Sequence, residues 1–129
     1  MFMRLKNFTL NFSVQVFKCL ADDSRLRILF QVHENQQMCI SDLELILNFT
    51  QAKTSRHLLY LKNNGVLNSR KVDQWVFYNV KEEVKDLLSQ AFRFVEKDQL
   101  LQKDLETFKV MYSNRELALN KLHNRKWIN

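Results

Sequence analysis

The chain has 129 residues, the size of one compact domain, and hydrophobic residues make up 46% of it, which is enough to form a core. One glycine and no proline favour long helices, and they exclude the glycine-rich loops that bind nucleotide phosphates. The formal net charge of +6 favours an anionic partner, with nucleic acid ahead of an anionic membrane surface.

Membrane insertion and secretion are not indicated by the sequence. No apolar run approaches the roughly 20 residues that cross a bilayer. The first segment mixes Arg4, Lys6 and two asparagines into its apolar residues, unlike a secretory signal peptide. We therefore expect a cytoplasmic protein that makes no membrane contact.

Two helices are predicted in the N-terminal part of the chain. Apolar residues near helical spacing predict the first over about residues 10–20. The side-chain oxygens of Asp22, Asp23 and Ser24 can accept the unpaired N–H groups that begin the second. That helix is expected to end at residues 35–37.

A helix-turn-helix is predicted next. Ser41 and Glu44 have the spacing of a capping box, in which each side chain accepts from the backbone N–H of the other, and a short helix follows. After a turn, Thr50 is expected to cap a second helix over residues 51–63. Gly65 suits the left-handed residue that follows a helix.

Beyond Gly65 the pattern changes from helical to extended. Residues 69–72 and 75–80 are predicted to form a hairpin, since the second segment is rich in β-branched and aromatic residues. Asp73 and Gln74 form a turn that lacks the usual glycine. A short helix, a turn, a second helix and a basic hairpin follow one another in a winged helix-turn-helix.

This order of elements predicts binding to double-stranded DNA. The major groove admits one helix, which reads base edges from its N-terminal part. Residues 51–80 hold five basic residues and one acidic residue, so they contribute +4 of the net charge. The candidate DNA contacts are Gln51, Lys53, Thr54, Ser55, Arg56 and His57 on the helix, with Arg70, Lys71 and Gln74 on the hairpin.

Simpler interpretations exist for several of these residues. A charged helix face is often only solvated, which applies to Lys53 and Arg56. His57 can also pack against a neighbouring helix. Trp75 and the other aromatic residues of its strand fit hairpin packing better than base stacking.

Several short stretches together carry a family resemblance: residues 17–22, 24–29, 39–43, 54–58 with Leu61, 65–67 and 75–78. In their order and spacing the sequence resembles the ArsR family of bacterial winged-helix repressors. Asp23 stands where the family commonly has proline, and Gln74 where many members have glycine. The resemblance implies a homodimer on operator DNA, released by a metal ion, arsenite or a redox signal.

The metal sites that the resemblance implies are not expected here. Cys39 matches the first residue of the family's Cys-x-Cys pair, but Ser41 replaces the second. A soft metal ion needs three or four nitrogen or sulfur ligands. The positions of the family's other site read Glu82, Val84, Val95 and Asp98, without either histidine. We expect no metal and no cofactor.

The two cysteines, Cys19 and Cys39, are too few for a disulfide framework. Two buried apolar side chains are the simpler interpretation. A redox pair is the alternative, and it requires their Cα atoms to come within roughly 7 Å.

From Lys81 onward a long amphipathic helix is predicted, because no breaker interrupts its apolar spacing of about 3.5 residues. Its length favours self-association, with Asp98 fixing the register or marking where the helix leaves the interface. The alternative is a tail that folds back on its own subunit. The predicted dimerisation residues are Leu87, Leu88, Ala91, Phe94, Val95, Leu101, Leu105 and Phe108.

The expected fold is mainly α (α+β): a winged helix-turn-helix with a two-stranded β wing and a long C-terminal dimerisation helix. Residues 1–80 form the DNA-binding domain and 81–129 the dimerisation region. The expected function is a sequence-specific, dimeric transcriptional repressor. The alternatives are a thiol, redox or small-ligand sensor on this scaffold that uses Cys39, and a protein-interaction module that has lost DNA binding. An enzyme is not expected, since the three histidines lie far apart and no nucleophile motif is present.

Overall fold

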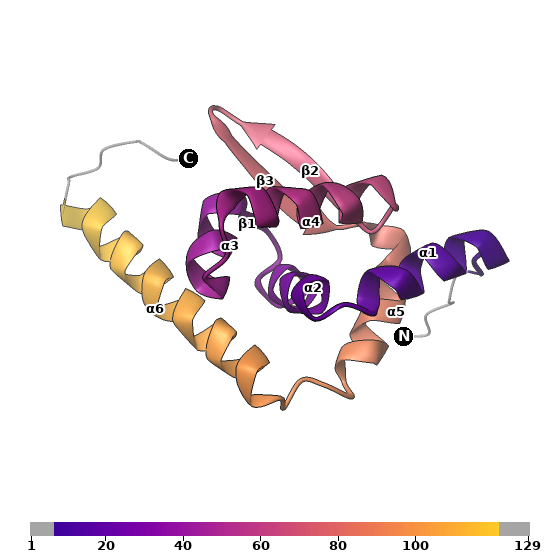
Figure 1. Ribbon diagram of the computed structural model, residues 1–129. Helices are drawn as coiled ribbons and strands as arrows, with labels where there is room; N and C mark the ends of the chain where they lie inside the picture. The colour runs from indigo at the N-terminus through magenta and orange to yellow at the C-terminus, as the bar shows by residue number, and fades with distance from the viewer. Residues whose placement is uncertain (1–6, 122–129) are drawn as a thin grey trace, which may run out of the picture.

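The structure is a computed structural model that describes residues 7–121. Six helices and three strands follow one another in this part of the chain (Figure 1). They are α1 (Leu10–Leu20), α2 (Asp23–Asn35), β1 (Met38–Cys39), α3 (Ile40–Leu47), α4 (Gln51–Asn63), β2 (Leu67–Val72), β3 (Trp75–Val80), α5 (Glu82–Phe92) and α6 (Gln99–Lys121).

Side-chain caps fix the starts of two predicted helices. The Asp22 carboxylate accepts from the backbone N–H of Arg25 at the start of α2, 3.1 Å away. The Thr50 hydroxyl accepts from the N–H of Lys53 at the start of α4, also at 3.1 Å. Each cap satisfies a donor that the helix itself leaves unpaired, and both confirm the predicted starts.

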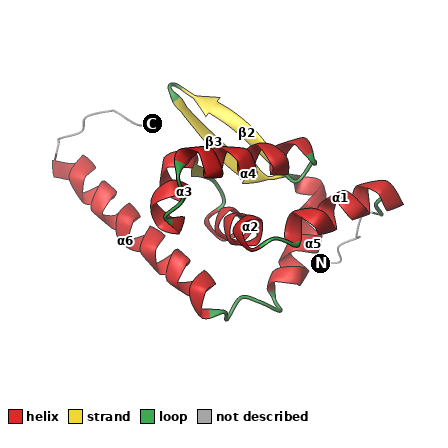
Figure 2. Ribbon diagram, viewed as in Figure 1, coloured by secondary structure: helices red, strands yellow, loops and turns green. Residues whose placement is uncertain are grey.

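The three strands form one antiparallel sheet in the order β1-β3-β2. Figure 2 shows the hairpin of β2 and β3 in yellow. The hairpin of β2 and β3 is the predicted wing, closed where Val72 pairs with Trp75. In the turn, Asp73 takes the left-handed φ of 58° that a glycine would otherwise supply. The short strand β1 was not predicted; it pairs Met38 with Tyr78.

Helix α2 lies at the centre of the fold, with the other elements around it (Figure 1). Ile28 and Leu29 of this helix are fully buried, and the predicted inner side of α4 packs into the same core through Leu58 and Leu61. After α4, Gly65 has a φ of 79°, and an added Cβ would lie 2.9 Å from the Phe12 ring. The positive φ favours glycine here, and a larger residue would also have to displace the Phe12 ring.

The predicted capping box at Ser41 and Glu44 is wrong. Helix α3 begins at Ile40, one residue before Ser41, and Cys39 occupies the cap position without a side-chain cap bond. The reason is the strand β1, which keeps Cys39 extended in its pairing with Phe77 and brings the chain into the helix directly afterwards.

The predicted continuous helix after Lys81 is also wrong, because the chain turns between α5 and α6. The Asp98 carboxylate accepts from the backbone N–H groups of Leu100 and Leu101, at 3.0 and 3.2 Å, and so starts a new helix. Helix α6 then runs along α2 and α3 of its own chain, which is the fold-back alternative (Figure 1). Leu101 is 4% exposed there. Residues 122–129 of the predicted C-terminal region lie outside the described residues.

Candidate nucleic-acid interface

The N-terminal half of α4 presents polar and cationic side chains to solvent. Gln51, Ser55 and Arg56 are exposed, and Lys53 and His57 are half-buried. Their groups match the base-reading chemistry of the major groove, where Gln pairs with adenine and Arg or Lys with guanine. Five of the six predicted helix contacts are therefore accessible.

Thr54 is the exception, and its predicted role as a DNA contact is wrong. Its side chain is fully buried, and its hydroxyl donates to the Thr50 carbonyl at 2.8 Å. Thr54 lies on the same side of α4 as Leu58 and Leu61, so helical spacing directs it into the core. Thr54 therefore helps to pack α4 against the core.

The first turn of α4 is suited to an anion. The N-terminus of a helix carries partial positive charge and N–H groups without helical partners. Lys53 adds a full charge there, and its ammonium nitrogen lies 4.0 Å from the centre of the Phe49 ring. The aromatic ring thus holds this cation beside the end of the helix, where a phosphate would bind.

His57 lies one turn further along α4, near the Asp22 carboxylate that caps α2. Burial lowers the pKa of His57 from its ordinary 6.5, while the negative charge of Asp22 opposes that shift. Arg56, Arg25 and Lys53 lower it further. A lowered pKa leaves His57 mainly neutral at neutral pH, able to donate or accept one hydrogen bond.

The wing carries the remaining predicted contacts. Arg70, Lys71 and Gln74 are exposed, the last of them in the turn of the hairpin. The Arg70 guanidinium donates to the Gln37 side-chain oxygen at 3.0 Å, which ties its position to the start of the sheet. Exposed basic side chains on a hairpin have the chemistry to bind the phosphates of a nucleic-acid backbone.

Both cysteines are buried and free. Burial raises the pKa of Cys19 to about 11, although the Arg25 charge opposes the shift. Burial also raises the pKa of Cys39, whose thiol donates to the Asp42 carboxylate at 3.2 Å. Since the thiolate is the reactive form, both positions disfavour oxidation chemistry at neutral pH.

The positions that correspond to the second family metal site have structural roles. Val84 is fully buried in the core, and Asp98 caps α6. Among the side chains that the structure describes, no three from His, Cys, Asp or Glu gather in a way that could hold a metal ion.

The predicted dimerisation residues fall into two groups in the structure. Leu88 and Leu101 are buried in the core of their own chain, and four others are partly buried against it: Leu87, Val95, Leu105 and Phe108. Ala91 and Phe94, together with the partly buried Leu87, line a groove of about 330 Å³ between α1 and α5.

Helix α1 continues the surface of this groove with exposed apolar side chains, which sequence reasoning missed. Leu10, Val14 and Phe17 are 82%, 43% and 55% exposed, and Phe94, two residues beyond the end of α5, is 89% exposed. We call these four residues the α1/α5 apolar surface. The spacing of Leu10, Val14 and Phe17 predicts an apolar stripe along one side of a helix, but such a stripe equally fits a helix that packs into the core. In the part of the chain that the structure describes, no helix is both long enough and apolar enough to cross a bilayer.

The arrangement of α3, α4 and the β2–β3 hairpin defines a winged helix-turn-helix protein. Residues 22–69 match the model of the bacterial regulatory protein family arsR. The Listeria innocua cadmium resistance transcriptional regulatory protein CadC is 32% identical over 94 residues, which are 72% of this chain and 79% of that protein. The chain belongs to the arsR family of bacterial regulatory proteins.

Other relatives match over a shorter length. The Pseudomonas putida arsenic resistance transcriptional regulator ArsR1 is 42% identical over 69 residues, 54% of each chain. The Escherichia coli arsenical resistance operon repressor is 39% identical over 55% of this chain and 61% of its own. The chain thus spans little more than half the length of these relatives.

Solved structures share the fold. HlyU from Vibrio cholerae aligns with a TM-score of 0.61 at 32% identity, over 65% of this chain and 91% of that chain. The domain of Mb0332 from Mycobacterium bovis, described as a homodimeric winged helix-turn-helix DNA-binding domain, aligns with a TM-score of 0.62 at 21% identity, over 68% and 82% of the two chains.

Proposed function

We propose that the chain is a sequence-specific DNA-binding transcriptional regulator that acts as a homodimeric repressor in the cytoplasm. The observation that carries the proposal is the N-terminal half of α4, which exposes Gln51, Ser55 and Arg56 while Thr54 and Leu58 hold it to the core. Such a helix fits the major groove with its polar side chains toward the bases. Relatives named as repressors and transcriptional regulators support the same function.

The wing supports the proposal with a second basic surface. Arg70 and Lys71 are exposed on β2, and the hairpin projects away from the helices. Contacts of this kind to phosphates position a protein on the duplex without reading its sequence. We assign base reading to Gln51, Lys53, Ser55, Arg56 and His57, and backbone contact to Arg70, Lys71 and Gln74.

We propose that a second copy of this chain covers the α1/α5 apolar surface. Monomeric proteins rarely leave several large apolar side chains this exposed on one surface. The same surface on two copies can pair about a two-fold axis, and the two α4 helices would then read two half-sites of a symmetric operator. We therefore place the dimer contact on α1 and α5 rather than along the whole C-terminal region.

Selection from a randomised duplex library, followed by fluorescence anisotropy with the enriched duplex, tests this function. We expect saturable binding that weakens steeply as salt rises from about 50 to 200 mM, because phosphate contacts release counterions. An unrelated duplex of equal length is the control. Negligible binding with no enrichment would favour the interaction-module alternative. Binding that disappears on mild peroxide treatment and returns on reduction would favour the thiol sensor.

A further inference from the structure

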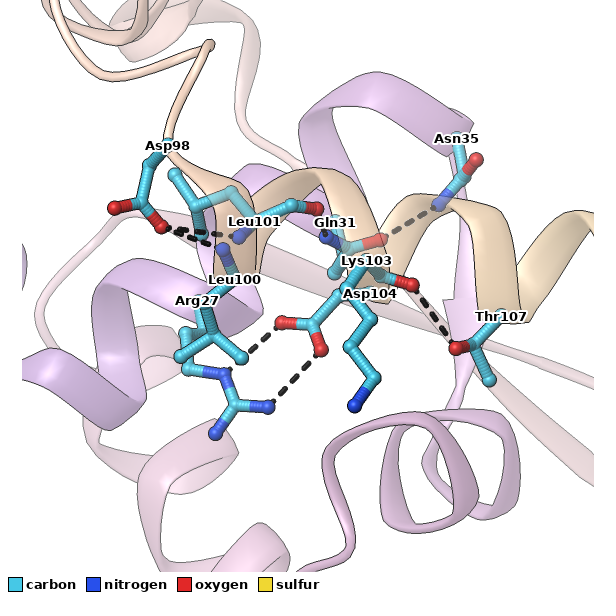
Figure 3. Close-up of polar contacts among 9 residues, drawn as sticks. All are labelled: Arg27, Gln31, Asn35, Asp98, Leu100, Leu101, Lys103, Asp104 and Thr107. Carbon is cyan, nitrogen blue, oxygen red and sulfur yellow. Dashed lines mark hydrogen bonds and ion pairs between the residues drawn. The ribbon is translucent and has the colours of Figure 1, made fainter.

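Helix α6 is attached to α2 by an ion pair between a buried carboxylate and a partly buried guanidinium (Figure 3). The Arg27 guanidinium donates two hydrogen bonds to the Asp104 carboxylate: Nε to Oδ2 at 2.9 Å and Nη2 to Oδ1 at 3.0 Å. Asp104 is 2% exposed. One turn along α2, the buried Gln31 amide donates to the Leu101 carbonyl at 3.3 Å. The register of α6 against α2 is therefore fixed by polar contacts and not by apolar packing alone.

The same guanidinium also contacts the turn between α3 and α4. Its central carbon lies 5.4 Å from the centre of the Phe49 ring. The ammonium nitrogen of Lys53 lies 4.0 Å from the centre of that ring. Phe49 directly precedes Thr50, the cap of α4. Asp104, Arg27, Phe49 and Lys53 thus form a continuous series of contacts from α6 to the first turn of the proposed reading helix, and we call it the Asp104–Lys53 series.

The ion pair in this series orients the Arg27 side chain in addition to holding α6 against α2. Apolar residues of similar volume often stabilise a fold as well as a buried ion pair does, because the charges lose their hydration. A bidentate guanidinium–carboxylate pair adds a fixed orientation of the planar guanidinium group. The orientation of the guanidinium sets its position against the Phe49 ring. The same ring contacts the Lys53 ammonium group.

We propose that Asp104 and Arg27 are positioning residues for DNA binding, and that α6, docked on its own subunit, sets the first turn of α4. The inference rests on the proposed DNA-binding function. It assigns to α6 a role in setting DNA affinity, although none of the residues in its ion pair belongs to the DNA-contacting surface. Release of α6 from α2 weakens duplex binding through Phe49.

The test compares Asp104→Asn with Glu106→Gln in anisotropy titrations of the duplex that the parent chain enriches from a randomised library. Glu106 is exposed on the same helix, so both variants remove one negative charge, but only Asp104→Asn breaks the ion pair. We expect Asp104→Asn to bind about 3- to 10-fold more weakly than Glu106→Gln. Circular dichroism and thermal unfolding establish that each variant is folded at the titration temperature.

Arg27→Lys is the milder second variant, since it keeps the charge but loses the planar fork, and we expect a smaller loss in the same direction. Phe49→Leu then separates positioning from general destabilisation. If the series carries the effect, Asp104→Asn and Arg27→Lys cause little further loss in the Phe49→Leu background. Additive losses, or affinities equal to that of Glu106→Gln, overturn the inference. Failure of the parent chain to bind any duplex overturns the proposed function itself, and the inference with it.

Discussion

The hydroxyl oxygen of Thr50 accepts the backbone N–H of Lys53, 3.1 Å away, at the end of α4 that we propose enters the major groove. We expect Thr50→Ala to lower the free energy of unfolding by about 1 kcal/mol, because it leaves this donor without its cap. Thr50→Ser keeps the hydroxyl and should stay close to the parent chain. Denaturant unfolding followed by circular dichroism measures both, and an alanine variant as stable as the serine variant would contradict the prediction.

The helices and strands that the sequence predicted correctly are those whose ends or periodicity are set by residues within the element or next to it. Thr50 and Gly65 mark the two ends of α4 through a side-chain cap and a positive φ, and both signals lie in residues that adjoin the helix. The wing follows from the alternation in residues 69–80, and Asp73 supplies the turn that glycine usually makes. The same local periodicity predicted which side chains of α4 and the wing reach solvent, with Thr54 as the exception; their contact with DNA stays a prediction.

The features that the sequence did not predict depend on contacts between distant segments. Strand β1 exists because Cys39 pairs with Phe77, and this pairing displaces the predicted cap at Ser41. The turn before α6 uses Asp98 as a cap, and the helix that follows is held to α2 by the ion pair of Asp104 with Arg27, 77 residues earlier. The spacing of apolar residues along a helix predicts that one side is buried, but it does not show whether that side packs against a partner subunit or against the chain's own core.

Arg56 should contribute to DNA affinity without contributing to stability. It is exposed in the second turn of α4, and we expect Arg56→Ala to weaken binding of the enriched duplex by about 1–3 kcal/mol. Lys62→Ala removes an equal charge from the last turn of the same helix, and it should change affinity much less because base reading uses the N-terminal part. Anisotropy titrations compare the two variants. Equal losses would indicate that only net charge matters.

Stability should depend on pH through the cap of α2. The hydrogen bond from the Arg25 N–H lowers the pKa of Asp22 from its ordinary 3.8. The unfolded chain then binds more protons between the two pKa values, so this stabilisation is complete above 3.8 and is lost as the pH falls through the folded-state pKa. Asp22→Asn keeps a side-chain oxygen that can accept the hydrogen bond but cannot be protonated in this pH range. The free energy of unfolding of this variant should therefore fall less as the pH is lowered. Denaturant unfolding from about pH 6 to pH 2 measures the difference, and parallel declines would refute it.

The α1/α5 apolar surface should control the oligomeric state. We expect Phe17→Glu to shift the chain from dimer to monomer in sedimentation experiments, because a charge there loses its hydration when the surface is covered. Leu45→Glu is the matched control, since Leu45 is 69% exposed on α3 and Phe17 is 55% exposed on α1. Phe17→Glu should also weaken binding to a symmetric operator more than binding to a single half-site. A dimer that survives this substitution would locate the contact elsewhere.

The thiols of Cys19 and Cys39 should react slowly while the chain is folded. Burial raises the pKa of Cys19 to about 11 and also raises the pKa of Cys39, so little of either is thiolate at neutral pH. We expect iodoacetamide to alkylate both cysteines much faster in denaturant than in buffer, with mass spectrometry as the readout and the denatured chain as the control. Mild peroxide should leave the folded chain unlinked. A Cys19–Cys39 disulfide formed under those conditions would require the two segments to approach one another. It would favour a thiol sensor, whereas the regulator proposed above involves no redox step.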